Sequence, residues 1–236
     1  MSIPFVHLLP FPHRPRSRRD WSMLLTGVLI PVAAVAAAYF LAPARVPLPY
    51  QGGGLSAGWL PPTVTHWQAL IDEMAKKYNL DPTMLAIVMT LESGGDAHAR
   101  SSAAAQGLMQ VTPPTAKDIA TKFLKKSVPK YNLQDPRTNI EFGAAYLAYL
   151  RDLFGNTRQA PDWNTTVELI TAGYNGGPGA AAQLEKGRGL TDIQTVVYSR
   201  DALNMWRERH ANRSPTYERW KERGGYILID AAQADQ

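Results

Sequence analysis

Cysteine is absent from the 236 residues of this sequence. Its absence excludes disulfide bridges, a cysteine nucleophile, thiolate metal ligands and an acylated N-terminal cysteine. Charged residues make up only 19% of the chain, whereas hydrophobic residues make up 45%. A chain of this length and composition can bury the core of one ordinary domain and still has room for an additional segment.

The chain also has little excess charge outside its first twenty residues. The formal net charge is +5, and +3 of it comes from the N-terminal segment, which contains Arg14, Arg16, Arg18, Arg19 and Asp20. The lysines between 122 and 130 are most simply explained as a solvated helix face. Nucleic-acid binding requires a concentrated basic patch or stripe, so we expect no nucleic-acid partner.

A long uncharged hydrophobic run occupies residues 21–42, "WSMLLTGVLIPVAAVAAAYFLA". At ~1.5 Å per residue, an α-helix of this length can cross a hydrocarbon core of ~30 Å. Several arginines precede the run and only Arg45 closely follows it, and basic residues tend to stay on the cytoplasmic side. We therefore expect a cytoplasmic basic stub at 1–20, a transmembrane helix at 21–42 that acts as a signal anchor, and export of the rest of the chain.

A cleaved signal peptide remains an alternative for this segment. The sequence "APA" at 42–44 could serve as a cleavage site, and "SRRDW" at 17–21 loosely resembles a twin-arginine signal. The hydrophobic run is longer than the roughly 7–15 residues typical of signal peptides, which favours an anchor. After it, residues 43–62 are rich in proline and glycine and predict an irregular linker.

Residues 63–210 carry the patterns of a single all-α domain. Apolar residues recur there at helical spacing, and alternating strand patterns are scarce. Capping residues and first-turn prolines mark several helix starts. We expect helices over 64–78 and from Pro82, Pro113, Pro136, Asn164 or Thr165, and Asp192, the last of them running toward His210. The tail 211–236 has no assigned role, and its "YILI" at 226–229 could be a short strand or an apolar patch that docks on the domain.

Glu92 lies where the helix pattern calls for a hydrophobic residue. It shares one face of the helix from Pro82 with Leu85, Val88 and Met89, so it projects from the buried face. It also lies in the last turn, near the negative end of the helix dipole. Both effects disfavour ionisation and should raise the pKa of Glu92, which is the profile of a general acid. A glutamate hydrogen-bonded to a neighbouring helix terminus is the alternative, and this local pattern alone favours it.

The wider sequence around Glu92 changes that balance. The stretch resembles the catalytic motif of the lytic transglycosylases with an SLT-type domain, which are related to goose-type lysozyme. The matching elements, which span about 64–205, are Glu92-Ser93, Ser101, "GLMQ" at 107–110, "PPTA" at 113–116, "NIEFGAAYL" at 139–147, "AGYNGGPG" at 172–179 and "QTVVY" at 194–198. The resemblance implies a lysozyme-like, SLT-type helical domain over 63–210.

The sequence departs from the family pattern at four positions. The apolar or aromatic residue usual three positions after the glutamate is Gly95, and a family glycine before "GLMQ" is Ala104. The Glu and Arg of the last element are replaced by Gln194 and Val196. These changes concern groove shape and substrate preference more than the chemistry, because Glu92 is retained.

The resemblance also implies a reaction. Glycosidases usually need two carboxylates, but Asp96 lies beyond the helix on a glycine turn, which leaves Glu92 as the single well-placed one. The family cleaves the bond between N-acetylmuramic acid and N-acetylglucosamine. Glu92 would protonate the bridging oxygen and then take the proton of the muramic C6 hydroxyl, which closes a 1,6-anhydro ring. No metal ion and no cofactor are implied.

Further residues receive binding roles from the same resemblance. We expect the substrate-binding residues to be Ser101, Met109, Gln110, Tyr174, Asn175 and Tyr198. A turn-capping role for Ser101, core packing for Met109 and helix termination for Asn175 remain alternatives.

The expected protein is thus a single-pass protein of the bacterial inner membrane, with its N-terminus in the cytoplasm and its catalytic domain in the periplasm. Its expected partners are peptidoglycan glycan strands and the membrane around 21–42, and a secretion or conjugation apparatus is a candidate. Two other functions stay open. One is a goose-type muramidase that uses water, and the other is a catalytically silent wall-binding subunit of such an apparatus.

Overall fold

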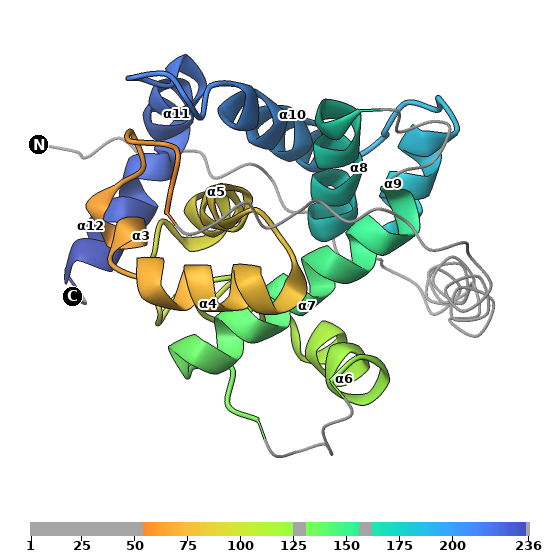
Figure 1. Ribbon diagram of the computed structural model, residues 1–236, viewed down its shortest axis with the longest axis horizontal. Helices are drawn as coiled ribbons and strands as arrows, with labels where there is room; N and C mark the ends of the chain where they lie inside the picture. The colour runs from red at the N-terminus through yellow and green to blue at the C-terminus, as the bar shows by residue number, and fades with distance from the viewer. Residues whose placement is uncertain (1–53, 125–130, 156–161, 235–236) are drawn as a thin grey trace, which may run out of the picture. The chain divides into compact units, whose positions relative to one another are not determined.

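The computed structural model describes residues 54–124, 131–155 and 162–234 (Figure 1). The predicted stub at 1–20, the predicted transmembrane helix at 21–42 and most of the predicted linker lie outside these residues. Within the described ranges the chain is helical, with two isolated β-bridges that join Gln106 to Arg100 and to Val111 and with no named strand. The prediction of an all-α domain is confirmed for this part of the chain.

The bounds of the helices are α3 Pro62–Thr65, α4 Gln68–Tyr78, α5 Pro82–Ser93, α6 Pro113–Lys122, α7 Pro136–Phe154, α8 Trp163–Gly176, α9 Pro178–Glu185, α10 Ile193–Arg207, α11 Pro215–Trp220, the π-helical turn η1 Lys221–Gly225, and α12 Tyr226–Ala234. Most of the helices follow one another closely, whereas the long loop 94–112 separates α5 from α6.

Four helix starts follow the predicted capping chemistry. The side chains of Asp81, Thr112, Asp135 and Asp192 each accept a hydrogen bond from a backbone N–H two or three residues later. Such caps satisfy N–H groups that have no partner within the helix. A proline occupies the first turn in three of the four helices, where its missing N–H costs nothing.

Several elements differ from the predictions. The helix expected over 64–78 is divided at His66 and Trp67, and the Trp67 indole donates a 3.0 Å hydrogen bond to the Gly95 carbonyl. The helix expected from Asn164 or Thr165 begins at Trp163, because Asp162 is its cap. The short helix α9 was not predicted. It is separated from α8 by Gly177, whose φ of 79° ends the preceding helix.

The tail also forms helices. The segment "YILI" belongs to α12 and not to a strand, and its Ile229 together with Ala232 is buried. These residues lie three positions apart, which places them on one face of the helix. That face docks on α3 and α5, so the alternative of a docking apolar patch describes this segment.

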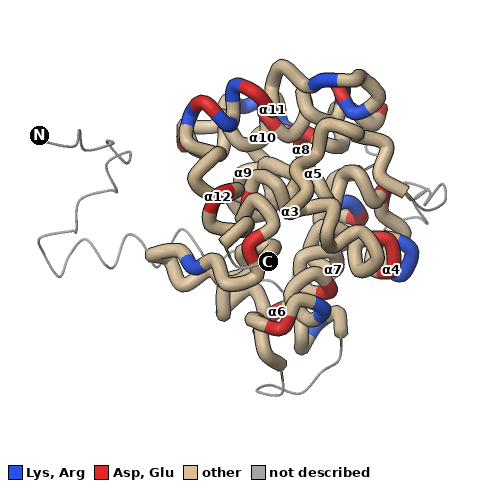
Figure 2. The backbone as a smooth tube through the Cα atoms, turned by 90° about the vertical axis from the view of Figure 1, so that its left-hand side faces the viewer, with Lys and Arg blue, Asp and Glu red and all other residues tan. Residues whose placement is uncertain are grey.

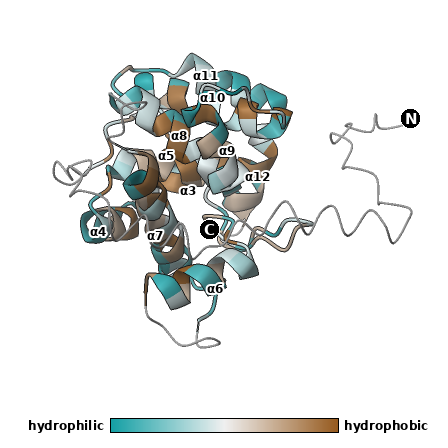
Figure 3. Ribbon diagram, turned by 90° about the vertical axis from the view of Figure 1, so that its right-hand side faces the viewer, coloured by the Kyte–Doolittle hydropathy of each residue, from teal (hydrophilic) through white to brown (hydrophobic). Residues whose placement is uncertain are grey.

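Helix α5 forms the centre of the core. Ten of its twelve residues are buried, among them Leu85, Val88 and Met89 with no exposed surface. Helices α3, α4, α10 and α12 contact it, and its ribbon is predominantly hydrophobic (Figure 3). A polar side chain on this helix therefore has mostly apolar neighbours, and Glu92, which is partly buried, is such a side chain.

The surface carries charges of both signs. Figure 2 shows basic and acidic residues interspersed on helices such as α4 and α11. Across the described ranges, no helix combines the length and the apolar character that a membrane crossing requires. The candidate anchor at 21–42 is outside those ranges.

Candidate active site

Glu92 occupies the last turn of α5, one residue before Ser93 ends the helix. The next residue, Gly94, is the C-cap in a left-handed conformation with φ 63°, which a glycine adopts without steric cost. Glu92 is partly buried. Burial raises the pKa of its carboxyl group from an ordinary value of 4.5 to about 7. The direction agrees with the inference from the helix pattern, and a carboxyl with this pKa can both give and take a proton near neutrality.

Tyr198 is the hydrogen-bond partner of Glu92. It lies on α10, which packs against α5 and α8, and its hydroxyl donates a 2.6 Å hydrogen bond to Glu92 Oε1. This bond opposes the effect of burial and lowers the pKa of Glu92. Burial and the nearby Glu92 hold the pKa of Tyr198 well above its usual value, so Tyr198 keeps its proton and acts as the donor.

Tyr174 lies close to the same carboxyl group but bonds elsewhere. Its hydroxyl donates a 2.8 Å hydrogen bond to the backbone carbonyl of Met109. Burial and the charge of Glu92 raise the pKa of Tyr174, which places the two side chains in one electrostatic environment. Tyr174 therefore joins the end of α8 to the loop that contains "GLMQ".

That loop is held by Asn139 of α7. Asn139 Oδ1 accepts a hydrogen bond from the Met109 amide, and Asn139 Nδ2 donates to the carbonyls of Gln106 and Leu133, all three at 2.7 Å. A Cβ on Gly107 would lie 2.5 Å from Asn139 Nδ2. The glycine is thus needed for the close approach of the loop to α7. Asn139 is a site residue that the sequence patterns do not single out, although it begins the "NIEFGAAYL" element at 139–147.

Ser93 and Met109 connect the same loop to the core. The hydroxyl of Ser93 donates a 2.8 Å hydrogen bond to the Leu108 carbonyl, and Met109 has no exposed surface. A Cβ on Gly143 of α7 would lie 2.7 Å from side-chain atoms of Met109. The side chain of Met109 therefore packs in the core, and it is its backbone carbonyl that reaches Tyr174.

Gln110 and Ser101 stabilise the loop backbone. The side-chain nitrogen Nε2 of Gln110 donates to the backbone carbonyls of Ala99 and Gly107, at 3.1 and 2.9 Å. Gln110 also adopts a φ of 45°, an uncommon conformation for a residue with a Cβ. Ser101 is exposed, and its hydroxyl accepts a 3.1 Å hydrogen bond from the Ala105 amide, which is the turn-capping alternative.

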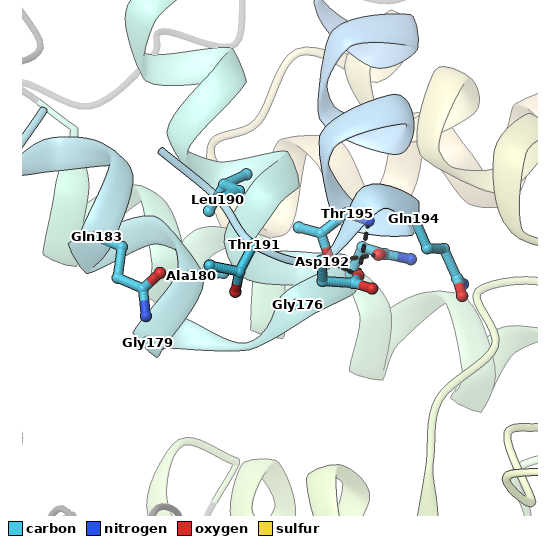
Figure 4. Close-up of a pocket in the computed structure, with 10 residues that line it drawn as sticks. Gly176, Gly179, Ala180, Gln183, Leu190, Thr191, Asp192, Gln194 and Thr195 are labelled. Atoms are coloured by element: carbon cyan, nitrogen blue, oxygen red, sulfur yellow. Dashed lines mark hydrogen bonds between the residues drawn. The ribbon is translucent and has the colours of Figure 1, made fainter. Parts of the chain in front are cut away.

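A pocket of about 450 Å³ opens where α8, α9 and α10 meet (Figure 4). Asn175 and Thr195 form part of its wall. The Thr195 hydroxyl donates a 2.6 Å hydrogen bond to Asp192 and lies 3.0 Å from Asn175 Oδ1. Gln194 lines the pocket and precedes Tyr198 by four residues. Residues with this spacing lie on the same face of a helix, so Gln194 lies one turn of α10 before Tyr198, although neither Tyr198 nor Glu92 is among the lining residues.

Apart from Ser101, which is exposed and caps a turn, the predicted binding residues fall into three groups. Tyr198 contacts Glu92 directly, and Tyr174 shares its surroundings. Met109 and Gln110 build the loop behind the carboxyl group, and Asn175 lines the adjacent pocket. No cluster of three or more His, Asp or Glu residues able to hold a metal ion occurs within the described ranges.

The chain is similar to a known protein family and to several of its members. The family model described as "Transglycosylase SLT domain" matches residues 69–197. Membrane-bound lytic murein transglycosylase C of Salmonella arizonae is 35% identical over 117 residues, which cover 49% of this chain and 32% of that protein. Membrane-bound lytic murein transglycosylase E of Buchnera aphidicola is 34% identical over 94 residues, which cover 39% of this chain and 42% of that protein.

A solved structure is also similar. It is an inactive variant of the lytic transglycosylase Slt from Pseudomonas aeruginosa, with a TM-score of 0.45 and 25% identity over 68% of this chain and 24% of that chain. The chain spans less than half the length of each of these relatives. The family model covers more than half of the chain and includes Glu92 and the loop that carries "GLMQ". The chain belongs to the Transglycosylase SLT domain family.

Proposed function

We propose that this protein is a peptidoglycan lytic transglycosylase that cleaves the β-1,4 bond between N-acetylmuramic acid and N-acetylglucosamine. The observation that carries the proposal is the Glu92 carboxyl, whose pKa is about 7 and which Tyr198 holds by a 2.6 Å hydrogen bond. Membership of the Transglycosylase SLT domain family supports the choice of substrate.

In the first step, protonated Glu92 acts as the general acid. Its proton passes to the glycosidic oxygen, the bond between that oxygen and the muramic C1 breaks, and positive charge develops at C1. The Glu92 carboxylate left behind faces this charge and stabilises it. The donated hydrogen bond of Tyr198 holds one oxygen of the carboxylate in place during this step.

In the second step, the same carboxylate acts as the base. It takes the proton of the muramic C6 hydroxyl while the C6 oxygen bonds to C1 and closes the 1,6-anhydro ring. Glu92 is protonated again, so the cycle consumes no water and leaves no net charge on the enzyme. Because the nucleophile belongs to the bound sugar, its effective concentration is high.

The environment of Asp96 supports a single-carboxylate reaction. Asp96 is buried beyond the end of α5, and its Oδ1 accepts a 2.7 Å hydrogen bond from the His98 amide. That contact stabilises the turn. An intramolecular nucleophile removes the need for a second carboxylate to activate water.

The remaining site residues receive roles by their position. We assign Asn175 and the pocket beside it to a part of the substrate adjoining the scissile bond, since α10 connects this pocket to Tyr198. Tyr174 and Gln110 shape the wall near Glu92, Met109 supports this wall from the core, and exposed Ser101 is available to contact a glycan strand.

We further propose the organisation derived from the sequence. Residues 1–20 would be cytoplasmic, 21–42 would anchor the protein in the bacterial inner membrane, and 43–62 would link the anchor to a periplasmic SLT-type domain at 63–210, followed by the tail at 211–236. The names of the Salmonella and Buchnera relatives, which describe them as membrane-bound, support association with the envelope. A trans-envelope secretion or conjugation apparatus remains a candidate partner.

The products formed from purified sacculi test the reaction. Mass spectrometry should detect 1,6-anhydromuropeptides with the full-length protein and none with Glu92→Gln. Products with a free reducing end would assign the protein to the goose-type muramidases instead. Binding of sacculi with no product from the wild type would leave a silent wall-binding subunit. A Glu92→Gln variant with full activity would refute the role of Glu92.

A further inference from the structure

The turn that follows Glu92 is tightly enclosed on the side of α3. The hydroxyl of Thr63 donates a 2.6 Å hydrogen bond to the carbonyl of Gly94, the C-cap of α5. A Cβ on Gly95 would overlap the backbone of Thr63, with only 2.6 Å to its carbonyl carbon. The backbone of α3 thus occupies the space at the position where the family carries an apolar or aromatic side chain.

The same turn is enclosed on its other side by α12. A Cβ on Gly94 would lie 2.9 Å from the Leu228 carbonyl carbon and the Ile229 amide nitrogen. Gly94 also has a positive φ, so a side chain there would be strained as well as obstructed. Two consecutive glycines after Glu92 therefore allow two separate backbone segments to touch the end of α5.

Both enclosing helices lie outside the residues that match the family model, 69–197. We call the described residues before 69 the N-terminal flank and those after 197 the C-terminal flank. The two flanks also contact each other. The rings of Trp59 and Tyr217 lie 5.5 Å apart, and the Trp59 indole donates a 3.1 Å hydrogen bond to the Glu208 carbonyl. Figures 1 and 3 show α3 and α12 together beside α5. The flanks thus form one layer against the end of this helix.

The C-terminal flank is tied to α10, the helix that carries Tyr198. Arg223 in η1 forms an ion pair with Asp201, a buried residue one turn beyond Tyr198. Glu208 accepts hydrogen bonds from the Thr216 amide and hydroxyl, at 3.1 and 2.9 Å. The layer therefore contacts both helices whose relative position sets the distance between Glu92 and Tyr198.

We propose that α3 and α12 form a clamp on Gly94 and Gly95 that positions Glu92 against Tyr198. This inference rests on the function proposed above. Helix ends fray unless their last carbonyls have partners, and Glu92 lies in the last turn of α5. The Thr63 hydroxyl supplies such a partner at Gly94, and the backbone of α12 lies against the same residue. Thr63 and Ile229 are positioning residues, because neither touches the reacting atoms.

The first test removes the Thr63 hydroxyl while keeping the shape of its side chain. In the full-length protein, Thr63→Val should lower kcat by between about tenfold and ~10²-fold, because a small misplacement of a catalytic group has effects of this size, with KM nearly unchanged. The matched control is Thr65→Val, whose hydroxyl bonds only within α3, to the Pro62 carbonyl. This control should keep wild-type kcat.

The second test concerns α12. The buried side chain of Ile229 anchors the helix whose backbone lies against Gly94, whereas Ile227 on the same helix is 49% exposed. Ile229→Ala should lower kcat in the same way as Thr63→Val, and Ile227→Ala should not. Equal kcat values for the two alanine variants would remove α12 from the clamp.

A titration that needs no turnover separates this inference from the proposed function. The carboxyl carbon of Glu92 can be followed by ¹³C NMR and assigned by its absence in Glu92→Gln. Loosening the clamp admits water to the carboxyl, so Thr63→Val and Ile229→Ala should lower the pKa of Glu92 below about 7. A purely structural role would lower thermal stability and leave this titration unchanged. An unchanged titration in both variants overturns the clamp even if the wild type forms anhydro products.

Discussion

The hydroxyl of Tyr198 and the carboxyl of Glu92 are 2.6 Å apart although 106 positions separate them in the sequence. The bond joins the end of α5 to the second turn of α10. This hydrogen bond has two consequences for catalysis. It orients the carboxyl group, and it favours the ionised form that burial disfavours. The pKa of about 7 is the result of both effects.

Tyr198→Phe tests this balance. Removal of the hydroxyl takes away the interaction that lowers the pKa of Glu92, so the pKa should rise. Since the first step needs protonated Glu92, the fall in kcat/KM at alkaline pH should move to higher pH. The maximum rate should drop by ~10-fold to ~10²-fold, because the carboxyl loses its orientation.

The control for this variant is Tyr146→Phe. The Tyr146 hydroxyl donates to the Gly173 carbonyl and not to Glu92, so its pH profile should keep the wild-type shape. An alkaline limb that moves to lower pH in Tyr198→Phe would contradict the assigned direction of the hydrogen bond.

The raised pKa of Glu92 also makes a prediction about stability. Between the ordinary value of 4.5 and the folded value of about 7, the folded state binds more protons than the unfolded state. The free energy of unfolding should therefore decrease as the pH rises through this window. Glutamine cannot ionise, so Glu92→Gln should be more stable than the wild type above the window.

Urea unfolding at two pH values measures the difference. At about pH 8, Glu92→Gln should gain ~1–3 kcal/mol over the wild type, a range reduced for the partial exposure of the side chain. At about pH 4 the difference should largely vanish, since Glu92 is then protonated in both states. A gap that is the same at both values would show that ionisation of Glu92 has no part in it.

Gln194 tests the pocket beside the Glu92–Tyr198 pair. Its side chain is exposed and lines the pocket, without a contact to Glu92 in the structure. Gln194→Ala should raise KM for glycan strands and leave kcat nearly unchanged, the signature of lost binding that is equal in the ground and transition states. Gln68→Ala, at the exposed start of α4, is the control. A fall in kcat with unchanged KM would place Gln194 in the chemistry and not in binding.

Two glycines should respond in opposite ways to substitution by alanine. A Cβ on Gly143 would lie 2.7 Å from Met109, whereas nothing lies within 4 Å of a Cβ on Gly179 in α9. Gly143→Ala should lower the free energy of unfolding by ~1–3 kcal/mol through overpacking. Gly179→Ala should raise it by ~0.5–1 kcal/mol, because alanine favours a helix. Thermal or urea denaturation measures the change in the free energy of unfolding for both variants. A stabilising Gly143→Ala would refute the close packing of Met109.

The local features of this protein could be read from its sequence. Asp81, Thr112, Asp135 and Asp192 bond to amides two or three residues away, so the start of each helix depends on neighbours along the chain. The buried direction of Glu92 follows from helical spacing within one helix. These properties use contacts of a few residues, and they were enough to predict the all-α fold and a carboxyl group with a raised pKa.

The tertiary structure decided which groups surround that carboxyl. Tyr174 was expected to bind substrate, and the structure adds that its hydroxyl bonds to the Met109 carbonyl, 65 positions away. The segment "YILI" became a helix, because docking on α3 and α5 buries Ile229. Such outcomes depend on backbone segments that meet only in the folded chain, where packing outweighs local preference. A single sequence contains no direct record of those distances.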